Sequence, residues 1–102
     1  MFFFEELNNK KFILPKNFVL YSIYPNPLNP VTVFNYAMPE KCQVSISIYN
    51  MLGKELERLY NGRQVPGYHS ATWDASEYSS GVYFVKIVAG EYMDTQKLVL
   101  VK

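Results

Sequence analysis

Turn-forming residues recur along the whole sequence and leave only short segments between them. These residues favour turns for different reasons: Pro fixes the backbone angle φ, Gly permits unusual backbone angles, and the side chains of Asn, Asp and Ser bond the nearby main chain. The intervening segments are about six to ten residues long, which predicts a small all-β sandwich and excludes long helices. The clusters are NPLNP (26–30), MPEK (38–41), MLGK (51–54), NGRQVPG (61–67), DASEYSSG (74–81) and AGEY (89–92).

Two segments alternate clearly between apolar and polar residues. In QVSISIYN (43–50), Val44, Ile46 and Ile48 alternate with hydroxyl-bearing residues. A period of two places the aliphatic side chains on one face of a strand, so this strand is expected to be half buried. In TVFNYAMP (32–39) the same logic places Phe34, Tyr36 and Met38 inward and Asn35 outward, with Pro39 closing the strand.

The last two segments are more apolar. GVYFVKIVAG (81–90) carries apolar side chains on both faces, interrupted only by Lys86, which indicates a central strand or one with a covered second surface. In TQKLVLVK (95–102), Leu98 and Leu100 oppose Val99 and Val101. The segment KELERLYN (54–61) fits an exposed strand better than a short helix, because turn residues flank it at hairpin spacing.

Seven short strands in a chain of this length predict an immunoglobulin-like antiparallel β-sandwich. Cys42 is the only cysteine, so the sandwich has no disulfide. The expected strands are 18–24, 31–38, 42–50, 54–60, 67–74, 81–89 and 92–101.

A chain of 102 residues is expected to form one domain. Residues 1–16 are interpreted as a linker or leader from upstream sequence, and 17–102 as the domain.

No apolar run approaches the roughly 20 residues of a membrane span, and MFFFEELNNKK lacks the basic start and long apolar run of a signal peptide. An export signal is therefore expected on upstream sequence. The net charge of +1 is too small to produce a long-range electrostatic field that attracts nucleic acid or an anionic membrane.

Little in the sequence is suited to catalysis. His69 is the only histidine. It lies on the same face of its expected strand as Ala71 and Trp73, which predicts a packed position or one at the rim of the core. No cysteine cluster, metal-ligand motif or glycine-rich phosphate loop is present, so no catalytic, cofactor or metal site is predicted. The acidic residues are interpreted as turn residues, although a glycosidase pair among them stays open: Asp74, Glu77, Glu91 and Asp94.

Aromatic residues favour an alternative, a carbohydrate-binding or cell-surface attachment module of a secreted enzyme. Sugar rings stack on exposed aromatic faces, and sandwiches often carry such platforms. Against this, the phase of Trp73 with Ala71 predicts an inward, core position. The candidate platform residues are Tyr68, Trp73, Tyr78, Tyr83 and Tyr92.

The stretch YPNPLNP (24–30) is the most rigid part of the sequence. Proline fixes φ, and the residue before each proline is pushed toward extended geometry, so Asn26 and Asn29 are not helical. The stretch is interpreted as a corner between the first two strands. A calcium site that uses these two asparagines is a weaker hypothesis than a structural corner, because such a site normally contains several carboxylates.

Five separated segments, in order, resemble the type A C-terminal sorting domain of the type IX secretion system of Bacteroidetes-like bacteria. That domain is similar in turn to the immunoglobulin-like domain of the flagellar hook-capping protein. The resemblance covers about residues 14 to 102. The segments are LPKNFVLYSIYPNPLNPVTVFNY (14–36), VSISIYNMLGKEL (44–56), GYHSATWDAS (67–76), SSGVYFVKIVAGEYMDTQK (79–97) and KLVLVK (97–102).

The resemblance implies a non-catalytic secretion signal rather than an enzyme. In that family the domain is the last module of a cargo protein, and the outer-membrane translocon recognises it after export to the periplasm. In many members a sortase-like peptidase then removes it, and the cargo reaches the cell surface. The positions that match the family motifs are Pro25, Asn26, Pro27, Asn29, Pro30, Gly53, Trp73, Gly81, Val82 and Tyr83, with Lys97 and Lys102 in the last strand.

The sequence departs from the family pattern in the corner. Leu28 replaces the usual Phe, and YSIYPNP replaces the more polar YQNYPNP. Both are apolar changes that are expected to alter packing more than recognition.

A terminal strand with basic ends is suited to pairing with a receptor, because main-chain hydrogen bonds supply affinity and alternate side chains supply selectivity. We therefore expect the last strand and the adjoining sheet face to contact the translocon. An edge strand can also pair with a second copy or exchange between copies, so a homodimer or strand swap is expected for the isolated domain. A purely structural spacer is a further alternative, which a position at the chain's end disfavours. The expected recognition residues are Lys97, Leu98, Val99, Leu100, Val101 and Lys102.

Overall fold

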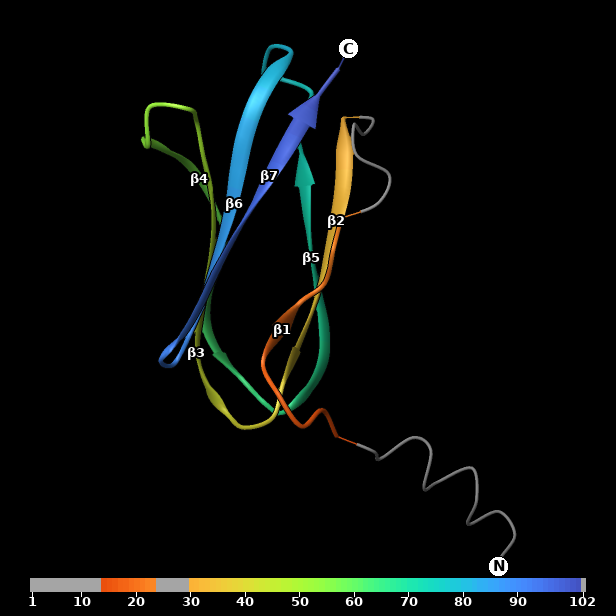
Figure 1. Cartoon of the computed structure of the whole chain (residues 1–102), viewed down its shortest axis with the longest axis vertical. Coiled ribbons are helices and arrows are strands. Elements are labelled where there is room, and N and C mark those ends of the chain that lie inside the picture. Colours follow the sequence, from red (N-terminus) through yellow and green to blue (C-terminus); the bar gives the residue numbers. More distant parts are fainter. Residues whose placement is uncertain (1–13, 24–29, 102) are drawn as a thin grey trace, which may run out of the picture.

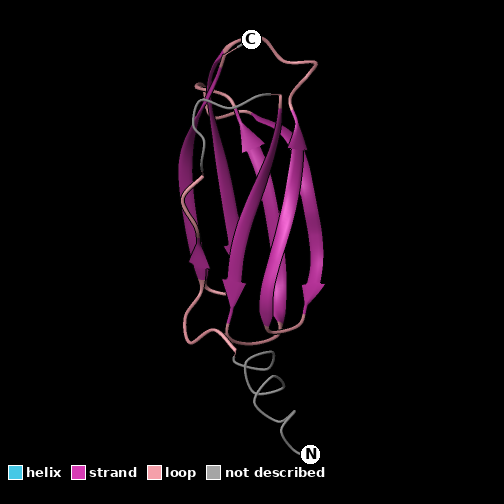
Figure 2. Ribbon diagram, turned by 90° about the vertical axis from the view of Figure 1, so that its right-hand side faces the viewer, coloured by secondary structure: helices cyan, strands magenta, loops and turns pink. Residues whose placement is uncertain are grey.

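The structure is a β-sandwich of two antiparallel sheets (Figure 1). It is a computed structural model that describes residues 14–23 and 30–101. Figure 2 shows the strands running together along the length of the molecule. One sheet has the order β1-β2-β5, with bounds Val19–Leu20, Val31–Met38 and Gly67–Asp74. The other has the order β4-β3-β6-β7, with bounds Glu55–Gln64, Cys42–Tyr49, Gly81–Ala89 and Tyr92–Leu100.

The architecture confirms the predicted fold class. In the described residues seven strands form two antiparallel sheets, and the thiol of Cys42 is free. The fourth strand pairs with the third, whereas in a constant-type immunoglobulin domain it joins the other sheet. The predicted central strand, β6, lies between β3 and β7. The two-residue turn between β6 and β7 has Gly90 at φ +62°, as the first position of a type II′ turn requires.

The predicted bounds match β2, β5 and β6, extend one residue too far in β3 and β7, and are wrong for β1 and β4. The largest error is NGRQVPG, which was expected to be a turn. Asn61 and Gly62 continue β4 and pair with Ser45 and Val44, and the side chain of Gln43 donates to Asn61 Oδ1 at 3.0 Å. Two register shifts opposite β3 accommodate the extra residues of β4. The Asn-Gly pair is therefore a strand segment, because its neighbours across the sheet override its local turn preference.

The first strand is shorter than predicted. Residues 18–24 were expected to pair, but β1 comprises only Val19 and Leu20, opposite Ala37 and Tyr36. The N–H of Tyr21 adds one further bond to the carbonyl of Asn35 at 3.0 Å. Residue 24 lies outside the described residues.

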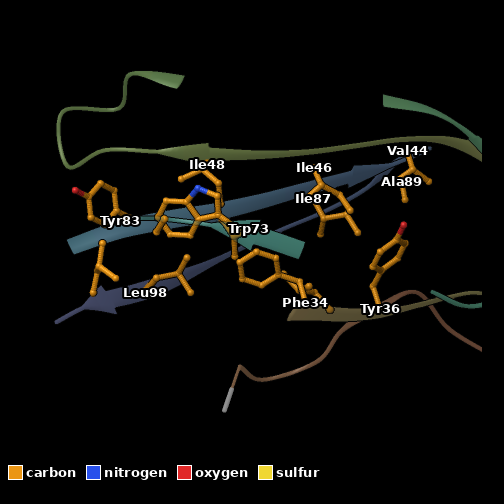
Figure 3. Close-up of a cluster of buried hydrophobic side chains, with 14 of the residues drawn as sticks. Phe34, Tyr36, Val44, Ile46, Ile48, Trp73, Tyr83, Ile87, Ala89 and Leu98 are labelled. Atoms are coloured by element: carbon orange, nitrogen blue, oxygen red, sulfur yellow. The ribbon is translucent and has the colours of Figure 1, made fainter. Parts of the chain in front are cut away.

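The core lies between the sheets and confirms the predicted alternation. Trp73 is fully buried (0% exposed) and reaches from β5 toward the four-stranded sheet. Figure 3 shows its indole among Ile48, Leu98, Phe34 and Tyr83. The ring centroids of Trp73 and Tyr83 lie 5.5 Å apart in an edge-to-face arrangement, which aromatic pairs prefer. The inward positions predicted in the second and third strands are all buried: Phe34, Tyr36, Met38, Val44, Ile46 and Ile48.

Two buried polar atoms have no hydrogen-bond partner among the described residues, namely Thr32 Oγ1 and Trp73 Nε1. A buried donor without a partner costs free energy, so the apolar contacts of the indole outweigh the cost of its N–H.

Replacement of Trp73 by Ala should lower the free energy of unfolding by about 3–5 kcal/mol, because a large cavity would remain between the sheets. Urea unfolding followed by circular dichroism measures this, since the variant lacks the only tryptophan. The matched control is Leu52→Ala, at a side chain that is 93% exposed, where the change should stay within about 0.5 kcal/mol. Equal effects at the two positions would contradict the central role of Trp73.

Candidate recognition surface

The last strand divides the predicted recognition residues between two faces. Leu98 and Leu100 point inward and are buried in the core. Lys97 and Val101 are exposed and Val99 is half-buried, because side chains alternate along a strand. Lys102 lies outside the described residues. The outward side chains of the last strand therefore differ in role from the two leucines, which hold the strand to the sandwich.

The outward residues of β7 continue a mixed apolar and basic surface across the four-stranded sheet. Phe84 lies opposite both Lys97 and Tyr49, so the three form one row across the strands. Lys86 lies in the next row, and its Nζ is 5.9 Å from the centre of the Tyr49 ring, within the range of a cation–π contact. Val99 lies opposite Val82. We call Tyr49, Val82, Phe84, Lys86, Lys97 and Val99 the outer patch.

A rigid turn adjoins the outer patch. The side-chain oxygen of Asn50 accepts bonds from the N–H groups of Leu52 (2.9 Å) and Lys54 (3.0 Å). Gly53 has φ +85°, a conformation that favours glycine. This agrees with its place in the family motif, which predicted a hairpin turn here. The turn exposes Met51 and Leu52 to solvent. Met51, Tyr49, Phe84 and Lys86 line a shallow hollow of about 260 Å³.

Three further motif positions that the structure describes make contacts within the fold or begin a strand. Gly81 begins β6, as predicted. Tyr83 is buried, and its hydroxyl donates to the carbonyl of Ser79 at 2.6 Å. The carbonyl of Pro30 accepts a bond from Ala75 N–H at 2.6 Å, which joins the start of β2 to the end of β5. The remaining corner residues lie outside the described residues: Pro25, Asn26, Pro27, Leu28 and Asn29.

The histidine occupies a rim position, as its phase predicted. His69 is half-buried, and its ring stacks on Tyr36 with centroids 5.5 Å apart. Its Nε2 lies 2.8 Å from the carbonyl oxygen of Val65. These contacts give the imidazole a structural role at the β4–β5 connection.

Two of the four acidic residues considered for a glycosidase pair, Asp74 and Asp94, accept hydrogen bonds from neighbouring backbone groups. Asp74 Oδ1 accepts a bond from Ser76 N–H at 3.0 Å, and Asp94 Oδ1 accepts one from Thr95 N–H at 2.9 Å. Both are the local bonds expected of turn and strand-edge carboxylates. Across residues 14–23 and 30–101, no group of three or more His, Cys, Asp or Glu side chains is arranged to hold a metal ion. No helix in the same residues is long and apolar enough to cross a membrane.

The aromatic side chains do not support a carbohydrate platform. Trp73 and Tyr83 are buried, while Tyr78 and Tyr92 are half-buried. Tyr68 is 61% exposed but belongs to none of the ring pairs found among the described residues. None of the ring pairs found among the described residues joins two exposed aromatic side chains, so the platform that the alternative requires has no support in this part of the chain.

A family model described as "Secretion system C-terminal sorting domain" matches residues 22–102. The chain belongs to this family. Membership implies a C-terminal sorting signal of type IX secretion and export toward the cell surface or beyond it. The match includes the corner, the outer patch and the last strand. A sorting-signal family is also consistent with the scarcity of catalytic groups in the sequence.

One solved structure with the same fold is PorZ, an essential bacterial surface component of the type IX secretion system of Porphyromonas gingivalis. It is 21% identical to this chain, with a TM-score of 0.50. The alignment covers 81% of this chain but only 11% of the PorZ chain, so the likeness is to one part of a much longer protein. No curated protein matches the chain.

Gln96 and Tyr92 of β7 join the sheets at one side, a role that the sequence did not predict for either residue. Gln96 Nε2 donates to the carbonyl of Leu20 at 2.9 Å, and Leu20 N–H donates to the Tyr92 hydroxyl at 3.2 Å. The Tyr92 ring also stacks on Phe18, with centroids 5.4 Å apart. Burial raises the pKa of the Tyr92 hydroxyl, although the bond from Leu20 lowers it. No local pattern announces these contacts, because they join residues about 70 positions apart.

Replacement of Gln96 by Ala should loosen β1 from β7 and cost about 1 kcal/mol, because the carbonyl of Leu20 loses its side-chain donor. Hydrogen exchange measures the effect: the amide of Tyr21 should exchange faster, while the core amides of β6 keep their relative protection. Thr95→Ala, at an exposed neighbour, is the control and should leave Tyr21 unchanged. Identical exchange in both variants would show that Gln96 does not hold β1.

Proposed function

We propose that this chain is a non-catalytic C-terminal signal domain that directs an attached cargo protein across the outer membrane by type IX secretion and to the cell surface. The observation that carries the proposal is the family match over residues 22–102. In this proposal residues 17–102 form the sorting domain, and residues 1–16 connect it to the upstream cargo. Its partners are the outer-membrane translocon and a sortase-like peptidase.

The translocon is proposed to contact the last strand, Lys97 to Lys102. Leu98 and Leu100 are buried, so in the folded domain their part is to hold the strand in place. The side chains of this segment that reach the surface are those of Lys97, Val99 and Val101, which lie on or next to the outer patch.

The outer patch supports this proposal by its chemistry. It combines half-buried aromatic side chains with two lysines, and Lys97 lies directly opposite Phe84. Aromatic residues supply contact area at interfaces, and charges at the rim give orientation and specificity. A receptor surface with apolar and acidic side chains is complementary to this arrangement.

Charge reversal separates recognition from folding. With the domain fused to a periplasmic reporter in a host with type IX secretion, Lys97→Glu should reduce surface display about tenfold, equivalent to about 1.4 kcal/mol of binding free energy. The melting temperature should change by only a few degrees, because Lys97 is exposed and an interaction at an exposed charge contributes at most about 1 kcal/mol. Lys41→Glu, at an exposed residue outside the outer patch, is the control for charge alone.

Further outcomes distinguish the parts of the proposal. Leu98→Ala should lower both display and the melting temperature, because it leaves a cavity in the core. Normal display of the Lys97→Glu fusion would refute the recognition role of this residue and leave the sorting role standing. Absence of display with the unaltered domain, or equal display in a host without the translocon, would refute the sorting role itself.

A further inference from the structure

The sheet edges of this sandwich are protected unequally. An open strand edge presents backbone N–H and C=O groups that can pair with another chain, and proteins usually protect such edges. On one side of the sandwich, β1 is only two residues long and is joined to β7 by Gln96 and Tyr92. Lys97 and Val99 of β7 also have interaction partners. These contacts protect part of this side.

On the opposite side, the edge strand β4 has features that commonly discourage pairing with another chain. It has charged residues along its length, including Glu55, Glu57, Arg58 and Arg63. Two register shifts interrupt its pairing with β3. Charges and irregularities of this kind discourage further strand addition.

The adjacent edge strand, β5, lacks these protections. It pairs with β2 in an unbroken register over eight residues, from Gly67 to Asp74. No Lys, Arg, Asp or Glu occurs between Gly67 and Trp73, and no proline interrupts the strand. It is the regular and uncharged edge of the described sandwich.

The hydrogen-bond phase defines which groups of β5 face outward. Ala75 N–H bonds the carbonyl of Pro30, and the register places these two residues opposite each other. Because bonded and non-bonded pairs alternate in an antiparallel ladder, the even-numbered residues of β5 direct their N–H and C=O groups away from β2. Tyr68, Ser70 and Thr72 therefore present unpaired backbone groups along this edge, as far as the described residues go, and their side chains are exposed.

The solvent-facing side of the same sheet is partly apolar. Val31 is 53% exposed and Val33 is 48% exposed, next to Thr72 and Asp74 of β5. Tyr68 is the most exposed aromatic side chain of this face. An apolar surface beside an open edge supplies contact area to a strand that adds there.

We propose that the β5 edge binds the same edge of a second copy of this chain, so that two three-stranded sheets form one continuous antiparallel sheet. A twofold axis beside Ser70 places Ser70 opposite Ser70 of the partner subunit. The same axis places Tyr68 opposite Thr72 of the partner subunit, and Thr72 opposite the partner's Tyr68. All of these residues carry outward backbone groups, so each pair can exchange two hydrogen bonds.

A second copy fits this edge because the edge is self-complementary. An aromatic residue facing a β-branched residue, and a hydroxyl facing a hydroxyl, are favourable cross-strand pairs, and no like charges meet. The net charge of +1 adds little repulsion between copies. The contact is isologous, so it closes at two subunits. Strand pairing alone buries less surface than a standard interface, so the dimer is expected to be weak.

Sedimentation equilibrium of the chain over a concentration series tests the proposal. The average mass should rise from 11.9 kDa toward twice that value as the concentration increases. Hydrogen exchange at the same concentrations should slow at the amides of Tyr68, Ser70 and Thr72 and stay constant along β4. A mass of 11.9 kDa at every concentration would overturn the proposal, and so would slowing confined to other strands.

Two variants localise the contact to β5. Ser70→Pro removes an N–H that the fold does not use and should weaken dimerisation about tenfold or more, because both central hydrogen bonds are lost. Ser70→Lys places like charges opposite each other and should act in the same direction. Asn61→Lys adds the same charge to an exposed position of β4 and should leave dimerisation unchanged. Circular dichroism confirms folding of each variant.

Other results count against the second copy. If folded Ser70→Pro and Ser70→Lys both dimerise like the unaltered chain, the interface lies elsewhere and the proposal is wrong. If the chain stays monomeric and the β5 amides slow only when translocon proteins are added, the edge binds a different protein. None of these results depends on whether the chain acts as a sorting signal.

Discussion

Apolar packing between two sheets is the constraint on which this domain depends, because its single cysteine leaves no covalent link between them. Trp73 supplies the largest side chain to that contact. It extends from the three-stranded sheet to Tyr83 of the four-stranded sheet and also contacts Tyr78 with ring centroids 5.5 Å apart. Immunoglobulin domains combine a buried tryptophan with an inter-sheet disulfide, whereas here the aromatic cluster packs between the sheets without one.

The alternation of apolar and polar residues predicted most of this fold, because successive side chains of a strand point to its opposite faces. Where one face is buried, a shift of one residue would expose every core side chain, so the pattern in 43–50 fixes which face is inward. Local turn chemistry was a weaker guide. The Asn-Gly pair at 61–62 has the residues of a tight turn, yet pairing with Ser45 and Val44 carries it into β4. The short extent of β1 was also not predictable, since it depends on contacts with β7 rather than on its own residues.

The candidate site was predictable in position but not in detail. The last strand could be placed from its alternating apolar residues, and the separation of Leu98 and Leu100 from Val99 and Val101 follows from the same period. The row that brings Lys97, Phe84 and Tyr49 together requires the register of three strands, which no single segment contains. The open character of the β5 edge likewise depends on strand order and hydrogen-bond phase. A sequence can indicate which strands exist before it can indicate which edges remain unpaired.

The chain enters the sandwich through β1 at one end and leaves through β7 at the other (Figure 1). A pull applied between these two points would act along the strands rather than across them. The bonds from Gln96 and Tyr92 to Leu20 would then be loaded together in shear instead of opening one after another. The domain is thereby arranged to resist mechanical extension from its ends, and its strands would separate more easily if the force were applied sideways to the sheet.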